Sequence, residues 1–144
     1  MTLKPPAAID SSVLLDVALK DPAHFETSRL ALNQLGQESV LIISPVVYAE
    51  VAVHFDDRDY FANWIDKRPF QIQSNNEEVA WWASRFFRRY AEQSSPPAET
   101  RRKILPDFFI AAHSHVHANY LLTRDRDFEK SYFQELKTAH PNQI

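Results

Sequence analysis

Cysteine is absent from this chain of 144 residues, and glycine occurs only once. Without cysteine the chain can form no disulfide framework and no cysteine-based metal site or nucleophile, and this composition is compatible with the reducing cytosol. A single glycine cannot build the glycine-rich loops that cradle phosphates, which excludes Walker-type and dinucleotide-binding sites. No apolar run approaches the roughly 20 residues that span a bilayer. We therefore expect a cytoplasmic protein that does not enter a membrane.

The hydrophobic content of 44% and the charged content of 24% are those of an ordinary globular protein. A chain of this length can bury one proper core, so we expect a single domain that covers residues 1–144. The net charge of −3 argues against non-specific nucleic-acid binding by the whole surface. It leaves room for a local basic patch.

Short apolar runs alternate with helical patterns along the chain. The apolar runs predict strands at residues 7–10, 40–43, 70–72, 120–123 and 135–138. Between them the periodicity predicts helices at residues 13–20, 21–36, 45–51 and 77–91, one that starts at residue 106, and a short one near 128–134. A helical hairpin is expected to follow the helix at 45–51, with Phe61, Trp64 and Ile65 on its inner face. Residues 93–103 are expected to form a loop. Strands that alternate with helices in this way predict an α/β fold with a parallel sheet covered by helices on both faces.

Several helix ends are marked by residues with a known local preference. Ser44, which precedes a proline, and Asn76 are good N-caps, and Pro106 suits the first turn of a helix. Gly36 is a good C-terminal stop for the helix that precedes it. In that helix we expect the core positions to be Phe25, Leu30, Leu32 and Leu35.

Acidic residues recur just after the predicted strands or early in the helices that follow them. Asp10 ends the first strand, and Asp125 comes just after the strand at 120–123. Glu50 lies two turns into the helix after the second strand, and Asp107 begins the helix at Pro106. Because the carboxyl ends of parallel strands meet at one edge of a sheet, these four acids could converge there.

Four converging carboxylates repel one another, and a divalent cation removes this repulsion. Carboxylate oxygens are ligands that suit Mg²⁺ or Mn²⁺. Such an ion could activate water and neutralise charge during cleavage of a phosphodiester. The pattern therefore predicts a metal site with hydrolytic chemistry.

Each acid also has a structural interpretation. An aspartate at a strand end more often caps a helix or faces solvent. Asp10 is a stronger candidate than most, because it follows a fully apolar strand and precedes two serines. Glu50 could simply reach solvent, and Asp107 could serve only as a favourable charge at a helix N-terminus. Of Asp125 and Asp127, one could be a turn residue. The spacing by itself therefore leaves the metal site as a hypothesis.

Four segments resemble the PIN-domain ribonucleases, and in particular the VapC-type toxins of bacterial toxin–antitoxin pairs. They are IDSSVLLD at 9–16, SPVVYAEV at 44–51, LPDFFIAAHS at 105–114 and LLTRDRDF at 121–128. The resemblance extends from Ile9 to about Phe133, in the order and approximate spacing of the family. One departure is Ala111, where the family often has glycine.

The resemblance implies a three-layer α/β/α sandwich with a central, mostly parallel sheet. It also implies Mg²⁺-dependent cleavage of RNA, with Mn²⁺ as a substitute metal, and it implies two protein contacts, namely a small VapB-like antitoxin and a second copy in a homodimer. The positions that match the family's metal-binding acids are Asp10, Glu50, Asp107 and Asp125, with Asp127 as a competitor for the last role. Ser12 and Thr123 match small hydroxyl residues that support the site.

Two further groups of residues have open interpretations. Basic residues bracket the loop at 93–103, and they could either contact RNA phosphates or form a solvated helix end that the helix dipole favours. They are Arg85, Arg88, Arg89, Arg101, Arg102 and Lys103, of which the last three are the candidates for RNA contact. His113 and His117 share one face of a helix. Without an HExxH-type base, packing or hydrogen bonding is favoured over a zinc site.

The main alternative to a nuclease is a PIN-like module that binds RNA or protein without cleaving it. The complete set of acids favours the nuclease, because a degenerate site would have lost at least one of them. A phosphate-accepting receiver domain is excluded, since the region 70–76 offers no acceptor aspartate after the third strand.

Overall fold

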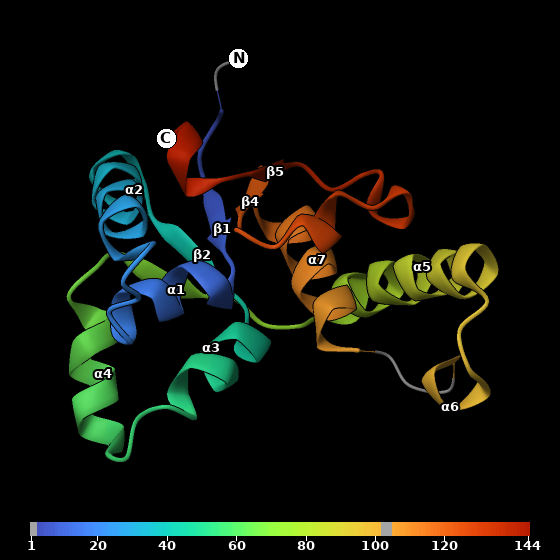
Figure 1. Ribbon diagram of the computed structural model, residues 1–144, viewed down its shortest axis with the longest axis horizontal. Coiled ribbons are helices and arrows are strands. Elements are labelled where there is room, and N and C mark those ends of the chain that lie inside the picture. Colours follow the sequence, from blue (N-terminus) through green and yellow to red (C-terminus); the bar gives the residue numbers. More distant parts are fainter. Residues whose placement is uncertain (1–2, 102–104) are drawn as a thin grey trace.

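Five short strands form one parallel sheet in the computed structural model (Figure 1). The structure describes residues 3–101 and 105–144, with residues 100 and 101 described by their backbone alone. The strands are β1 (Ala7–Ile9), β2 (Leu41–Ile43), β3 (Phe70–Ile72), β4 (Tyr120–Leu122) and β5 (Thr138–Ala139). Their order in the sheet is β3-β2-β1-β4-β5. The predicted parallel sheet is confirmed, and β3 lies at one edge of it.

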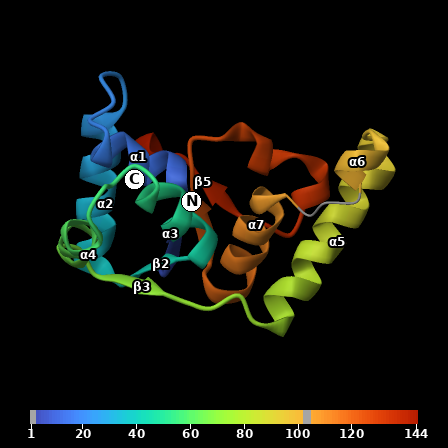
Figure 2. The same cartoon turned by 90° about the horizontal axis from the view of Figure 1, so that it is seen from below.

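Helices cover both faces of this sheet. They are α1 (Ser11–Ala18), α2 (Phe25–Glu38), α3 (Pro45–Ala52), α4 (Arg58–Asp66), α5 (Glu77–Ser94), α6 (Ala98–Arg101) and α7 (Pro106–His117). Figures 1 and 2 show α1, α2 and α4 on one side of the sheet and α5 and α7 on the other. The fold is therefore the expected three-layer α/β/α sandwich. Within the described residues, none of the helices combines the length and the apolar character needed to cross a bilayer.

The core lies around the three central strands. All residues of β1, β2 and β4 are buried, as expected of strands that are covered on both faces. α7 packs against β1 and β4, and α5 packs in turn on α7. The ring of Phe86 on α5 is fully buried and packs edge-on against Phe133 at a centroid distance of 5.3 Å.

Three of the predicted helix starts, those marked by Ser44, Asn76 and Pro106, are confirmed. The Ser44 hydroxyl accepts a hydrogen bond of 3.0 Å from the backbone N–H of Val47, and Asn76 Oδ1 accepts one of 2.9 Å from Val79. These bonds satisfy backbone donors that the first turn leaves without a partner. Pro106 occupies the first turn of α7, where its missing N–H costs nothing.

The prediction for α2 was wrong in three respects. The helix begins at Phe25 rather than at residue 21, and it continues through Gly36 to Glu38. Leu30 is 54% exposed, and Ala31 next to it is buried instead. A Cβ at Gly36 would lie 3.3 Å from Cδ of Pro69. A glycine inside a helix lowers its stability by roughly 0.5–1 kcal/mol relative to alanine. The close approach of Pro69, rather than a helix end, therefore explains why glycine stands at position 36.

Other boundaries also differ from the prediction. α5 runs to Ser94 and α6 follows, both inside the stretch expected to be a loop. The helix expected near 128–134 consists of two short 3₁₀ helices, η1 (Arg126–Glu129) and η2 (Ser131–Phe133). The last strand, β5, comes later than expected because its register is set by pairing of Thr138 with Leu121 on β4. A final 3₁₀ helix, η3 (Pro141–Gln143), packs on α2.

Candidate active site

The four predicted acids come from four segments that meet at the carboxyl edge of the sheet. Asp10 directly follows β1, and Asp125 lies just beyond β4. Glu50 is on α3, which begins after β2, and Asp107 is in the first turn of α7. α3 and α7 pack against each other. The parallel topology therefore brings the ends of all four segments to one side of the molecule.

Asp10 is the most buried of these acids, with 4% of its surface exposed. Its Oδ2 accepts hydrogen bonds from the hydroxyls of Thr123 at 2.7 Å and Ser12 at 2.8 Å. The Thr123 hydroxyl in turn accepts a bond of 2.9 Å from the backbone N–H of Asp125. Burial raises the pKa of Asp10, and the hydrogen bonds from Thr123 and Ser12 oppose that rise. The two hydroxyls thus fix the Asp10 carboxylate and tie it to the segment that carries Asp125.

Glu50 has a buried carboxylate oxygen, Oε1, that has no hydrogen-bond partner among the described residues. Burial raises the pKa of Glu50, the Ser11 hydroxyl opposes the rise, and the charge of Asp10 adds to it. A buried polar atom without a partner costs free energy. This oxygen is therefore available to a proton or to a cation.

Asp107 lies within electrostatic reach of every other candidate acid. The residue as a whole is exposed, but other protein groups surround its carboxylate, and this loss of hydration, followed by repulsion from neighbouring acids, raises the pKa of Asp107 to about 6. In decreasing order of effect these acids are Asp10, Asp125, Glu50 and Asp127. The charges of the site are therefore coupled through Asp107.

Asp125 and Asp127 differ in their surroundings. Asp125 is half-buried and caps η1, with its Oδ1 accepting a bond of 2.9 Å from the backbone N–H of Asp127. Asp127 is exposed. The link from Asp125 through Thr123 to Asp10 favours Asp125 as the fourth acid of the site, and its role stays a prediction.

The acids fit a divalent cation by their chemistry. Carboxylate oxygens are the donors that hard cations prefer, and both the unpartnered Oε1 of Glu50 and the repulsion at Asp107 would be relieved by positive charge. In the part of the chain that the structure describes, no three acidic or histidine side chains are already arranged around a common point that could hold a metal ion. Metal binding by these acids therefore stays a prediction.

One polar pair near the site was not singled out from the sequence. Asp16 on α1 is 2% exposed, and its carboxylate accepts hydrogen bonds from the Arg124 guanidinium and from the Ser28 hydroxyl. The available signal was an acid at a buried position of an otherwise apolar helix face, next to Val13 and Val17. Such an acid requires a partner inside the fold.

Two histidines of α7, His113 and His117, form hydrogen bonds to the segment between β3 and α5. Nε2 of His113 donates to the backbone carbonyl of Gln73 at 2.7 Å, and Nε2 of His117 to that of Ser74 at 3.0 Å. Burial lowers the pKa of His113 to about 4, so the ring is neutral at neutral pH. Both residues thus form hydrogen bonds of the kind that the sequence analysis favoured.

The basic residues offer less than expected to a nucleic acid. The side chain of Arg101, and Arg102 and Lys103 as a whole, lie outside the described residues, so their predicted RNA contact stays a prediction. On α5, Arg88 pairs with Glu92, and Arg89 with Glu135. These two arginines are already neutralised within the protein.

Comparisons with known proteins agree with the fold. A family model described as the PIN domain matches residues 7–134. VapBC2 from Rickettsia felis, solved with a DNA fragment from its promoter, matches with a TM-score of 0.69 and 16% identity over 93% of this chain and 97% of the other. DNA-bound VapBC from Salmonella typhimurium matches with a TM-score of 0.69 and 14% identity over 96% of this chain and 99% of the other. FitAcB from Neisseria gonorrhoeae matches with a TM-score of 0.62 and 20% identity over 96% of this chain and 100% of the other. No curated protein sequence matches at a significant level.

Proposed function

The chain belongs to the PIN domain family, and we propose that it is a metal-dependent endoribonuclease and the toxin of a VapBC-like toxin–antitoxin pair. PIN domains are generally nucleases. The VapBC and FitAcB structures share the fold over nearly their whole length, which supports the VapC type. A toxin of this kind acts on cellular RNA, so we place it in the cytoplasm.

The observation that carries this proposal is the electrostatic coupling of Asp107 to the other acids at one edge of the sheet. A set of carboxylates that raise one another's pKa costs stability, and such clusters of perturbed groups are concentrated at functional sites. The unpartnered Oε1 of Glu50 adds to this cost. A non-catalytic binding module would have no reason to retain both features.

In this proposal Asp10, Glu50, Asp107 and Asp125 hold the metal, which is Mg²⁺ or, as a substitute, Mn²⁺. When bound, the cation supplies neutralising charge at the phosphate and a more acidic water. Ser12 and Thr123 are positioning residues, since their hydroxyls fix one oxygen of Asp10. Asp107, whose pKa is about 6, is already mostly ionised at neutral pH, and a bound cation would lower that pKa further by offsetting the surrounding negative charge.

The test is cleavage of an RNA panel by the purified protein with Mg²⁺, with Mn²⁺ or with EDTA. We expect cleavage that requires the metal and that falls by at least about a hundred-fold in Asp10→Asn and Asp107→Asn. Asp66→Asn is the matched control, because Asp66 is an exposed aspartate at the end of α4. Each variant must retain the circular dichroism spectrum of the parent.

Two results would contradict the proposal. Full cleavage by metal-saturated Asp107→Asn would remove that residue from the site. A folded protein that binds Mn²⁺ but cleaves no RNA in the panel, including transfer and ribosomal RNAs, would favour the binding module. Calorimetric titration with Mn²⁺ separates this case from one in which the acids bind no metal at all.

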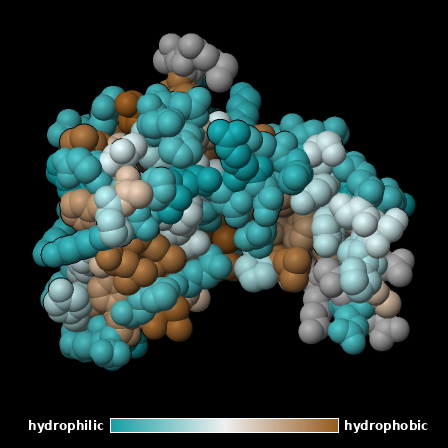
Figure 3. Space-filling view, in the orientation of Figure 1, coloured by the Kyte–Doolittle hydropathy of each residue, from teal (hydrophilic) through white to brown (hydrophobic). Residues whose placement is uncertain are grey.

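The antitoxin contact has a candidate surface beside α4. A groove of about 580 Å³ lies between the end of α1 and the segment that joins α3 to α4, and it includes Leu19, Tyr60 and Trp64. Leu19 is 54% exposed and Tyr60 is 65% exposed. Figure 3 shows hydrophobic residues gathered over α3 and α4 on this face. Exposed apolar surface of this kind is typical of a protein interface.

Co-purification tests this partner. The protein encoded by the adjoining reading frame should co-purify with the chain, and Tyr60→Asp should abolish the complex. Trp81→Asp is the matched control, since Trp81 is an aromatic residue with similar exposure on α5. Equal loss of the complex in both variants would place the interface elsewhere. We also propose a homodimer, for which light scattering of the purified complex should give two copies of this chain.

A further inference from the structure

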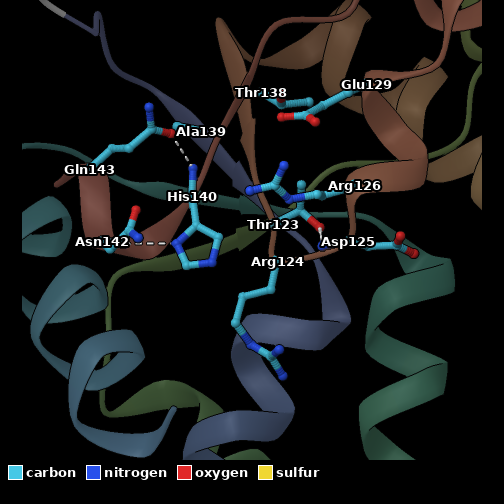
Figure 4. Close-up of a pocket in the computed structure, with 10 residues that line it drawn as sticks. All are labelled: Thr123, Arg124, Asp125, Arg126, Glu129, Thr138, Ala139, His140, Asn142 and Gln143. Carbon is cyan, nitrogen blue, oxygen red and sulfur yellow. Dashed lines mark hydrogen bonds between the residues drawn. The ribbon is translucent and has the colours of Figure 1, made fainter. Parts of the chain in front are cut away.

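A second polar pocket adjoins the acidic site, and we call it the C-terminal pocket. It has a volume of about 290 Å³. Its walls come from the end of β4, from η1, from β5 and from η3 (Figure 4). The residues that line it include Thr123, Asp125, Arg126, Glu129, Thr138 and Asn142. Because Thr123 and Asp125 belong to both, a ligand in this pocket would lie next to the proposed cleavage site.

The chemistry of the walls is mixed rather than basic. Arg124 points away from the pocket toward α1, where it is bonded to Asp16 (Figure 4). This leaves Arg126 as the cationic side chain directed into the pocket, and Glu129 opposes its charge (Figure 4). Among the described residues Arg126 forms no ion pair. The Glu129 carboxylate faces the pocket and disfavours a phosphate there, because the two negative charges repel each other (Figure 4).

The remaining groups suit a neutral ligand that has both donors and acceptors. Thr138 and Asn142 can each donate and accept hydrogen bonds, Glu129 accepts, and Arg126 donates. The edge of a nucleobase carries this combination, and unpaired bases of RNA are read by such edge contacts. The pocket volume of about 290 Å³ is just below the range for ligand pockets, roughly 300–1,000 Å³, and so suits one nucleoside rather than a larger ligand.

The far wall is fixed by the fold before any ligand arrives. Nδ1 of His140 accepts a hydrogen bond of 3.1 Å from the backbone N–H of Asn142, and Oε1 of Gln143 accepts one of 2.6 Å from the backbone N–H of His140. These bonds form a capping box for η3, whose Pro141 is buried. A wall held in this way loses little conformational entropy on binding.

We propose that the C-terminal pocket binds one unpaired nucleobase of the RNA, adjacent to the phosphodiester that the acidic site cleaves. Arg126, Glu129 and Asn142 supply the hydrogen bonds to the edge of the base. The consequence is a base preference at one position beside the cut. This consequence rests on the proposed ribonuclease function, whereas binding of the base does not.

Nuclear magnetic resonance of the ¹⁵N-labelled full chain tests the binding step without cleavage. The probes are AMP, GMP, CMP and UMP, with ribose 5-phosphate as the probe that lacks a base. We expect saturable shifts of the backbone amides of residues 124–129 and 138–143 with at least one nucleotide, with affinities that differ among the four bases. No shift with any nucleotide, or equal shifts with ribose 5-phosphate, would overturn the proposal, the second result because it would indicate a phosphate site.

Asn142→Ala is the sharpest variant for this test. The capping contact uses the backbone N–H of Asn142, so the substitution removes the side-chain amide and leaves η3 capped. We expect the affinity for the preferred nucleotide to fall about ten-fold, as for the loss of one or two hydrogen bonds. Gln34→Ala, an exposed amide on α2, is the matched control and should bind as the parent does. Equal affinity in Asn142→Ala and the parent would remove Asn142 from the pocket's function.

The effect on cleavage is measured with an RNA pool of randomised sequence. The parent should favour one base at a position beside the cut, and Asn142→Ala should reduce that preference about ten-fold in kcat/KM. An unchanged profile would overturn the role in site selection even if bases bind. If the parent cleaves no RNA, the proposed nuclease function fails, and the amide shifts still decide whether the pocket binds a base.

Discussion

The guanidinium of Arg124 donates two hydrogen bonds of 2.7 Å to the buried carboxylate of Asp16. Ser28 on α2 donates a third, of 2.6 Å, to the same carboxylate. Arg124 stands between Thr123, whose hydroxyl holds Asp10, and Asp125. The pair therefore fixes α1 and the turn after β4 to each other, and these two segments carry two of the four candidate acids.

Arg124→Ala should lower the free energy of unfolding by about 3–5 kcal/mol, because it leaves the charge of Asp16 buried without its partner. Urea denaturation at pH 7 measures the change. Arg88→Ala is the control, since its pair with Glu92 is exposed and should be worth less than about 1 kcal/mol. Equal losses in the two variants would mean that Asp16 does not depend on Arg124.

Thr123→Val should weaken Mn²⁺ binding about ten-fold. The substitution removes the donor to Asp10 and the acceptor for the backbone N–H of Asp125, and groups that orient metal ligands typically have effects of this size. Calorimetric titration gives the affinity. Ser131→Ala, which removes only an exposed hydrogen bond to Gln93, should leave it unchanged. Unaltered binding by Thr123→Val would show that the hydroxyl does not position the site.

Asp107→Asn should stabilise the metal-free protein at pH 8 and have little effect at pH 4. The pKa of Asp107 in the folded protein, about 6, is above that of the unfolded chain, so ionisation destabilises the fold as pH rises through the window from about 4 to 6. Because the residue is exposed, solvent screening reduces the gain to about 1 kcal/mol. Urea denaturation in EDTA across this range measures it, with Asp66→Asn as control. A gain that does not vary with pH would contradict the electrostatic explanation.

His113 should have the opposite pH dependence. Burial, opposed by the hydrogen bond to Gln73, lowers the pKa of His113 to about 4, whereas the unfolded chain takes up the proton near pH 6.5. The contribution of the neutral His113 ring to the free energy of unfolding is therefore complete above pH 6.5. As pH falls from 6.5 toward 4, the protein loses at most about 3 kcal/mol of this stability. His113→Gln, which can still donate to Gln73, should abolish this acid destabilisation, and His54→Gln, at an exposed position, should not. Identical pH profiles for the parent and His113→Gln would contradict it.

Local features of the sequence were sufficient to predict most of the elements. The central strands are short runs of apolar residues, and this pattern identifies a strand buried on both faces wherever it occurs. Ser44, Asn76 and Pro106 mark helix starts through interactions within a few residues. The positions of Asp10 and Asp125 after strands follow from the same local patterns.

The features that the sequence did not predict depend on partners far along the chain. Position 36 inside α2 is occupied by glycine because Pro69 leaves little room for a side chain there. Asp16 is tolerated in the core because the Arg124 guanidinium forms hydrogen bonds to its carboxylate. The C-terminal pocket exists only once η1 and η3 lie on either side of β4 and β5.

The sequence by itself therefore determined the parallel α/β fold and which acids stand at strand ends, because apolar periodicity, caps and prolines act over a few residues. Only the tertiary structure decided which side chains share one electrostatic environment. The coupling of Asp107 to Asp10 and the hydroxyl bonds from Thr123 to Asp10 arise from residues about a hundred positions apart. Electrostatic and hydrogen-bond partners are set by distance in space, which the order of residues in the chain does not contain.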